Sequence, residues 1–213
     1  KFKTEKLIGL RAVYGFFPAN ANGDDVQLYT DASRAESGKT LRFTRQQLKK
    51  ADSKPNYCLS DYIAPGAAPD HIAAFAVTAG IGLKKVVDAY KADNDDYNAI
   101  MSEAIADRLA EAFAEFLHKR VRDEWGFGKD ECLSTEELLS EKYRGIRQAA
   151  GYPACPDHTE KRTLWELLDV EKNTGMQLTE SCAMWPGSSV SGLYFSHPES
   201  KYFGMGNLGR DQI

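Results

Sequence analysis

The segment Tyr97–Glu124 restricts the fold of this chain more than any other sequence pattern. Its apolar residues recur at three- to five-residue intervals: Ile100, Ile105, Leu109, Phe113, Phe116, Leu117 and Val121. This spacing predicts an amphipathic α-helix, because it places the apolar side chains along one side. Asp95 and Asp96 favour its N-terminus, and Gly126 ends it. At about 1.5 Å per residue the helix would be about 40 Å long, so it would cross a whole domain.

Several shorter segments have the sequence patterns of β-strands. Leu7–Phe17 has the pattern of a buried strand, which we expect to end at Pro18. Val26–Thr30 and Thr40–Phe43 predict an antiparallel pair joined by a loop over residues 31–39. The remaining predicted strands are Ser60–Ile63, Ile72–Ala79, Met176–Ser181 and Ser189–Phe195.

Two shorter helices complete the expected elements. Ser134 and Glu137 have the spacing of a capping box, which would open a helix that runs to Lys142. The segment Thr159–Val170 carries an amphipathic helical pattern. The chain contains no internal repeat and no Pro/Ser-rich linker. The sequence therefore predicts a single α+β domain over residues 1–213, with a twisted antiparallel sheet, one long central helix and several short helices.

Charge and hydropathy exclude several classes of protein. The 27 Lys and Arg residues against 31 Asp and Glu give a formal net charge of −4, which argues against a nucleic-acid-binding protein. The longest apolar run, Ile72–Leu83, is too short to span a bilayer. Residues 1–6 lack the apolar core of a signal peptide, so we expect a cytoplasmic protein with no membrane partner. The 4 cysteines have no CxxC spacing, and we expect free thiols.

The segment Arg147–His158 combines one arginine with a glycine, a tyrosine and two prolines. Regular helices and strands do not tolerate this density of Gly and Pro, so we predict an irregular segment. A cation and an aromatic ring on an irregular segment are the usual chemistry of a small-ligand site. Arg147 can grip a carboxylate through two parallel hydrogen bonds, which a lysine cannot do.

Three other motifs do not meet their full requirements. Gly204–Gly209 matches G-x-G-x-x-G, but only four residues follow it, so the helix and the acidic residue of a dinucleotide site are missing. Glu36–Thr40 resembles the end of a phosphate loop whose leading glycine would be Ser33. Cys155 and His158 have metal-like spacing, but Pro156 lies between them and no second tight pair exists. We therefore expect a structural thiol, a hydrogen-bonded histidine and no metal site.

Two further features stay open on the residues alone. Asp107, Glu111 and Glu115 are four residues apart on the long helix and share one side. They form either a solvated surface paired with Arg108 and Lys119, or a negative strip that faces a bound cation.

The aromatic residues near the C-terminus leave a similar choice. Tyr152, Tyr194, Tyr202 and Phe203 fit core packing, and they also fit ring faces for an adenine or a sulfonium. Arg147 taken alone fits a structural salt bridge, which is the more common role of an isolated arginine.

Together these segments resemble the C-terminal activation domain of cobalamin-dependent methionine synthase, the module that binds S-adenosylmethionine. The resemblance is collinear over nearly the whole chain, and long strings such as Gly151–Pro156 and Val190–Pro198 make it specific. The segments that carry it are Phe17–Asn20, Gly23–Asp25, Ser60–Pro65, Asp95–Glu115, Gly145–Lys161 and Glu180–Phe203.

The resemblance implies binding positions for the ligand but no catalytic residue in this chain. Arg147 would contact the methionine carboxylate of the ligand, and Asp61 would take its ammonium. The other implied positions line or flank the site: Glu111, Ala149, Tyr152, Tyr202 and Phe203. The residue types suit the ligand, because it carries a carboxylate, an ammonium, a sulfonium and an adenine.

The implied function is reductive reactivation of methionine synthase, the enzyme that makes methionine from homocysteine. The domain would present the methyl group of S-adenosylmethionine to cob(II)alamin while a flavodoxin or flavodoxin-like reductase supplies one electron. Cobalamin would be held by a partner domain, and zinc would belong to another domain of the parent enzyme. We therefore expect the isolated fragment to be inactive alone, because the methyl and electron transfer would take place at the corrin cofactor and not at residues of this chain.

Three departures from the family pattern accompany this resemblance. Gln148 and Ala150 replace two prolines that would preset the backbone after Arg147, so we expect a more mobile segment before binding. Phe203 stands where a tyrosine is frequent. The sequence also lacks the helical segment that precedes the first strand in the family and the short helical tail that ends it.

Two alternatives from other classes stay open. The first is a non-catalytic module that binds S-adenosylmethionine or docks partner proteins. The second is a generic S-adenosylmethionine methyltransferase, against which the absence of a βαβ pattern with an early glycine-rich turn argues.

Overall fold

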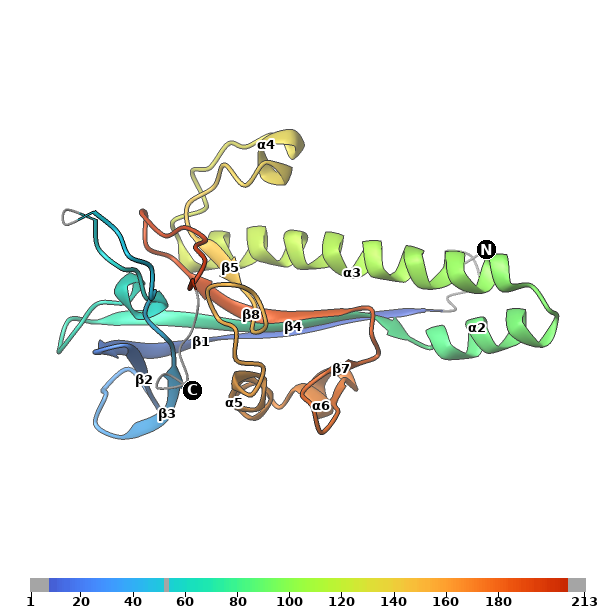
Figure 1. Ribbon diagram of the computed structural model, residues 1–213, viewed down its shortest axis with the longest axis horizontal. Coiled ribbons are helices and arrows are strands. Elements are labelled where there is room, and N and C mark those ends of the chain that lie inside the picture. The colour runs from blue at the N-terminus through green and yellow to red at the C-terminus, as the bar shows by residue number, and fades with distance from the viewer. Residues whose placement is uncertain (1–7, 52–53, 207–213) are drawn as a thin grey trace. The chain divides into compact units, whose positions relative to one another are not determined.

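The computed structural model describes residues 8–51 and 54–206, in which a mixed sheet-and-helix fold is present (Figure 1). One sheet contains six strands in the order β3-β2-β1-β4-β8-β5. Their bounds are β1 Gly9–Asn22, β2 Asp25–Tyr29, β3 Ser37–Arg42, β4 Asp70–Ile81, β5 Ile146–Gln148 and β8 Ser189–Phe195. A separate antiparallel pair joins β6 (Gln177–Leu178) to β7 (Met184–Trp185).

One helix is far longer than the others. The bounds are η1 Leu59–Tyr62, α2 Leu83–Ala92, α3 Asp96–Trp125, α4 Thr135–Leu139, α5 Glu160–Leu167 and α6 Val170–Thr174. The predicted α+β fold with an antiparallel sheet, one long helix and several short helices is confirmed.

The chain folds as two compact units, each assembled from segments that are distant in the sequence. Among the described residues, the first unit comprises 8–14, 75–143 and 164–191. The second unit comprises residues 15–51, 54–74, 144–163 and 192–206. The strands β1, β4 and β8 have residues in both units.

In the first unit, α3 has the ends that the sequence predicted, within one residue. Asp95 caps its N-terminus by accepting a hydrogen bond from the Asn98 N–H at 3.0 Å. Gly126 ends it with a left-handed backbone, φ 108°. Four of the nine buried residues of α3 are alanines, among them Ala106 and Ala110, while Ile100 is 65% exposed. The side of α3 that we predicted to be buried, from its large apolar residues, therefore coincides only partly with the side that is buried.

The helix α2 was not predicted. It begins at Leu83, directly after the Gly82 turn that follows β4. Leu83 is also the last residue of the apolar run Ile72–Leu83, of which we assigned only Ile72–Ala79 to a strand. In Figure 1 α2 lies beside the N-terminal part of α3. Leu83 and Val87 pack there against Ala99 and Ala106, whose small side chains allow a close approach.

In the second unit, the predicted hairpin is confirmed. Strands β2 and β3 pair antiparallel, with Val26 opposite Leu41 and both side chains buried. Strand β1 runs on through Pro18, where we expected it to end, because its pairing with β2 begins only at Ala19 and the missing proline N–H is not needed in that ladder. Leu7, the first residue of that predicted strand, lies outside the described residues.

The predicted strand over Ser60–Ile63 is wrong, because this segment is the 3-10 helix η1. The Asp61 carboxylate accepts a hydrogen bond from the backbone N–H of Cys58 at 2.8 Å, which closes the turn. The pattern was hidden because cysteine is not a typical N-cap residue.

The remaining predicted elements are partly confirmed. The capping box of Ser134 opens α4, which ends at Leu139 and not at Lys142. The helix expected over Thr159–Val170 is α5, which ends at Leu167; Asp169 has a left-handed backbone, and a second helix, α6, begins at Val170. Of the strands expected near the C-terminus, β8 has the predicted bounds and β6 is shorter than predicted.

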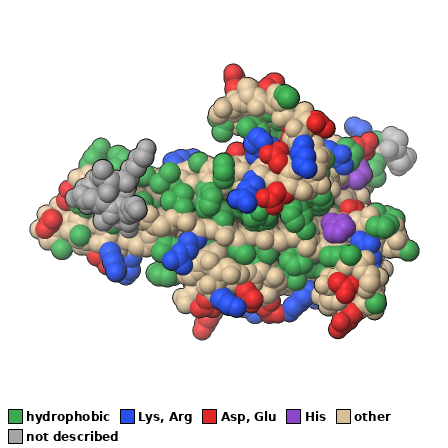
Figure 2. Space-filling model, turned by 180° about the vertical axis from the view of Figure 1, so that it is seen from behind, with side chains coloured by type: hydrophobic (Ala, Val, Ile, Leu, Met, Phe, Trp, Pro, Cys, Tyr) green, Lys and Arg blue, Asp and Glu red, His purple; other side chains and the backbone are tan. Residues whose placement is uncertain are grey.

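Two observations bear on the excluded classes of protein. None of the described helices combines the length and the apolar character that crossing a membrane would require. On the face displayed in Figure 2, basic and acidic side chains are interspersed. The segment resembling a phosphate loop lies largely in β3, and Asn207–Gly209 of the G-x-G-x-x-G motif lie outside the described residues.

Candidate functional site

Arg147 is held by a tyrosine hydroxyl at the edge of the sheet. It lies in the edge strand β5 opposite Tyr194 of β8, so the predicted irregular segment begins only after Gln148. The Tyr202 hydroxyl accepts a hydrogen bond from the Arg147 N–H and donates one to the Arg147 carbonyl, both at 3.2 Å. Tyr202 therefore fixes the backbone from which the arginine side chain projects.

Aromatic rings connect this strand edge to Asp61. Phe203 follows Tyr202, and its ring lies 6.5 Å from the ring of Tyr62 and 5.9 Å from the ring of Tyr57. Tyr62 follows Asp61 in η1. The contacts thus bring the predicted residues Arg147, Tyr202, Phe203 and Asp61 into one continuous region of the second unit.

Asp61 is held in one orientation by hydrogen bonds to its carboxylate. The guanidinium of Arg45 donates to both oxygens at 2.8 Å, and the Cys58 N–H donates to Oδ2 at 2.8 Å. Burial raises the pKa of Asp61, but these hydrogen bonds outweigh it, so the pKa lies below its ordinary value. The carboxylate is therefore ionised at neutral pH.

Ala149 and Tyr152 belong to a compact turn after β5. The Tyr152 N–H donates to the Ala149 carbonyl at 3.4 Å, and Gly151 donates to the Cys155 carbonyl at 2.7 Å. Gly151 has φ +97°, and a Cβ there would lie 2.2 Å from the ring of His158, so only glycine fits. The Tyr152 side chain is 62% exposed, which leaves its ring accessible.

The cysteine of this segment is a structural thiol by its surroundings. Cys155 is buried, and burial raises its pKa to about 12, so it is not a thiolate at neutral pH. His158 Nδ1 lies 2.9 Å from the Lys161 ammonium. Among residues 8–51 and 54–206, no three His, Cys, Asp or Glu side chains are grouped as a metal site.

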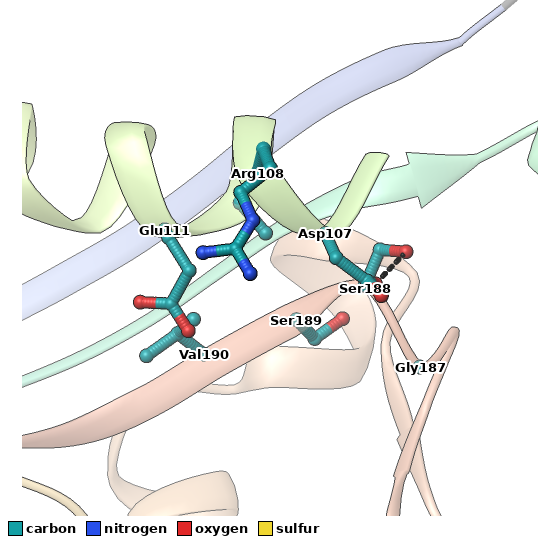
Figure 3. A pocket seen from close by; sticks show the side chains of 8 residues that line it. Asp107, Arg108, Glu111, Gly187, Ser188, Ser189 and Val190 are labelled. Atoms are coloured by element: carbon teal, nitrogen blue, oxygen red, sulfur yellow. Dashed lines mark hydrogen bonds between the residues drawn. The ribbon is translucent and has the colours of Figure 1, made fainter. Parts of the chain in front are cut away.

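Glu111 lies in the first unit, where it lines a cavity of about 260 Å³ (Figure 3). Asp107 and Arg108 of α3 line the same cavity, and Ser188 donates a hydrogen bond to Asp107 at 2.7 Å. Lys119, which we considered as a partner of the acidic stripe, pairs with Asp123 at 2.6 Å. Part of the stripe therefore faces a polar cavity.

Sequence reasoning missed four residues that surround the predicted ones. Arg45 forms one ion pair with Asp24 and another with Asp61. Lys201 donates a hydrogen bond to the Tyr57 hydroxyl at 3.0 Å and thereby lowers the pKa of Tyr57. No local signal marks Arg45, because its partners are distant in the sequence.

Two comparisons with known proteins show the family of this chain. The family model described as "Vitamin B12 dependent methionine synthase, activation domain" matches residues 1–213. A crystal structure described as the MetH reactivation domain bound to AdoHcy aligns with a TM-score of 0.96 and 55% sequence identity over 99% of this chain. This chain spans 66% of that chain, slightly less than two thirds of its length. The chain therefore belongs to the family of vitamin B12-dependent methionine synthase activation domains.

Proposed function

We propose that this chain binds S-adenosylmethionine and its product S-adenosylhomocysteine at the second unit. The observation that carries the proposal is the continuous region in which Tyr202 holds Arg147 and Tyr62 joins Phe203 to Asp61. Such a region offers a cation and an anion to the zwitterionic end of the ligand. The related reactivation domain, at 55% identity, is described as bound to AdoHcy.

In this proposal each group of the ligand has a counterpart. Arg147 receives the methionine carboxylate, and the ionised Asp61 receives the ammonium. The exposed rings of Tyr152 and Tyr202 suit the sulfonium or the adenine, because ring faces attract cations and stack on bases. Ala149 allows a close approach, and Phe203 flanks the site. Glu111 belongs to the first unit, and its role as a ligand contact is proposed on the resemblance alone.

The proposed reaction is the reductive methylation of cobalamin held by another domain of methionine synthase. Cobalamin, held by that other domain, would supply the acceptor for the methyl group of S-adenosylmethionine together with one electron from a flavodoxin-like donor, and S-adenosylhomocysteine would be left on this chain. The residues of this chain bind and orient the methyl donor, and they contribute no acid, base or nucleophile. The reaction returns the enzyme to the synthesis of methionine from homocysteine.

Calorimetric titration tests the binding proposal. We expect one molecule of S-adenosylmethionine or S-adenosylhomocysteine to bind per chain. We expect 5′-methylthioadenosine, which lacks the amino-acid end, to bind about tenfold or more weakly, because it cannot reach Arg147 and Asp61. Equal affinity for all three ligands would contradict the proposed contacts, and no binding would overturn the proposal.

A further inference from the structure

The carboxylate of Asp61 belongs to a three-residue cluster with Arg45 and Asp24. Arg45 lies 2.7 Å from Asp24 Oδ1 and 2.8 Å from Asp61 Oδ1 through the same terminal nitrogen. The cluster carries one positive and two negative side-chain charges, so its net charge is −1. A single ammonium group would neutralise it.

All three nitrogens of the Arg45 guanidinium are engaged by protein groups. Its Nε donates to Asp24, Nη1 donates to the Asn56 carbonyl and Asp61 Oδ2, and Nη2 faces Asp24 and Asp61 Oδ1. Four of these contacts are hydrogen bonds, and the contact of Nη2 with Asp24 is part of the ion pair. Arg45 is therefore a fixed part of the site.

The acceptor positions on Asp61 are unequally occupied. Oδ2 accepts from Arg45 and from the Cys58 N–H, whereas Oδ1 accepts from Arg45. A carboxylate oxygen has two lone-pair positions, so Oδ1 keeps one for a further donor. The Asp61 side chain is 37% exposed, so a ligand can reach it.

Asp24 is tied to the same short helix as Asp61. The Cys58 thiol donates to the Asp24 carbonyl at 3.5 Å, and the Ser60 hydroxyl donates to the Gly23 carbonyl at 3.0 Å. The loop that carries Asp24 is therefore packed on η1, which keeps the second carboxylate beside Arg45.

We propose that Arg45 and Asp24 are positioning residues for the ammonium group of the ligand, with Oδ1 of Asp61 as its acceptor. Arg45 fixes the orientation of Asp61, and Asp24 offsets the charge of Arg45 so that the cluster keeps a net charge of −1. This inference rests on the proposed binding of S-adenosylmethionine by Asp61.

Two substitutions separate the effect of the cluster's net charge from the effect of Arg45 on the orientation of Asp61. Asp24→Asn removes one negative charge and keeps an oxygen that accepts from Arg45. Arg45→Lys keeps the charge and removes the planar fork, which a lysine cannot replace. Each is expected to weaken S-adenosylhomocysteine binding about threefold to tenfold. Asp24→Glu keeps the negative charge and is expected to bind S-adenosylhomocysteine nearly as tightly as wild type.

The readout is calorimetry with S-adenosylhomocysteine and with its analogue that carries hydrogen in place of the α-amino group. The analogue is expected to bind wild type, Asp24→Asn, Arg45→Lys and Asp61→Asn with equal affinity. Asp61→Asn is expected to weaken the binding of S-adenosylhomocysteine about tenfold or more, and to leave the binding of the analogue unchanged. Arg120→Gln, which breaks the comparable pair of Arg120 with Glu124, is the control and should change neither affinity.

The outcomes distinguish the inference from the proposed function. If Asp61→Asn binds S-adenosylhomocysteine like wild type, the ammonium assignment and this inference both fail. If Asp61→Asn is weakened but Asp24→Asn and Arg45→Lys are not, the inference alone fails. Equal losses for both ligands would show structural damage and contradict the positioning role. A larger loss in Asp24→Asn than in Asp61→Asn would make Asp24 the contact residue and overturn the assignment.

Discussion

Replacing Arg147 with alanine is expected to weaken S-adenosylmethionine binding about tenfold or more. The reason is that a hydrogen bond to a charged group contributes about 1.5–3 kcal/mol, and the guanidinium is the proposed partner of the ligand carboxylate. The Tyr202 hydroxyl bonds the backbone of Arg147, so the strand edge should keep its geometry in the variant. Calorimetric titration of the variant against wild type measures the effect.

Two further variants make this result specific. Arg147→Lys keeps the charge without the bidentate geometry, so its affinity for S-adenosylmethionine should lie between those of Arg147→Ala and wild type. Arg162→Ala removes an exposed arginine of α5 from the same unit and should bind like wild type. Unchanged affinity in Arg147→Ala would remove Arg147 from the site.

The largest stability effect is expected at a buried ion pair in the first unit. Arg122 is 1% exposed and its Nε donates to Glu131 Oε2 at 3.0 Å, while its guanidinium carbon lies 3.9 Å from the ring centre of Tyr143. Glu131→Gln would leave a buried guanidinium without its counter-charge. Breaking such a pair costs about 3–5 kcal/mol, so we expect a loss of about 3 kcal/mol in the free energy of unfolding.

Chemical denaturation with matched variants checks this expectation. The double variant Arg122→Met with Glu131→Gln should be more stable than Glu131→Gln alone, because no charge stays buried without a partner. Lys84→Gln breaks the exposed pair with Asp88 and should change the free energy of unfolding by less than about 0.5 kcal/mol. A double variant that is less stable than Glu131→Gln would contradict this account.

Local sequence patterns predicted the elements whose signals are continuous along the chain. The helix α3 followed from apolar spacing together with Asp95 and Gly126, and the β2–β3 hairpin followed from two strand patterns with a loop between them. The helix α2 was missed because its first apolar residue continues the apolar run of β4. The buried side of α3 was misjudged because alanine carries a weak hydrophobic signal but packs closely.

The candidate site was predictable only where the family resemblance named its residues. Arg147, Tyr202 and Asp61 came from that comparison, and the structure adds how the tyrosine and η1 hold them. Arg45 and Asp24 could not be predicted, because Arg45 meets Asp61 and Asp24, 16 and 21 residues away in the sequence, only through tertiary structure.

We propose above all that this chain presents the methyl group of S-adenosylmethionine for cobalamin reactivation. The most direct measurement mixes it with the cobalamin-binding domain of methionine synthase in the cob(II)alamin state, a flavodoxin electron donor and S-adenosylmethionine, and follows the visible spectrum. We predict that methylcobalamin forms with the wild-type chain and forms more slowly with Arg147→Ala at a limiting ligand concentration. Methylcobalamin formation at the same rate without the chain, or none with the wild-type chain and bound ligand, would contradict the account.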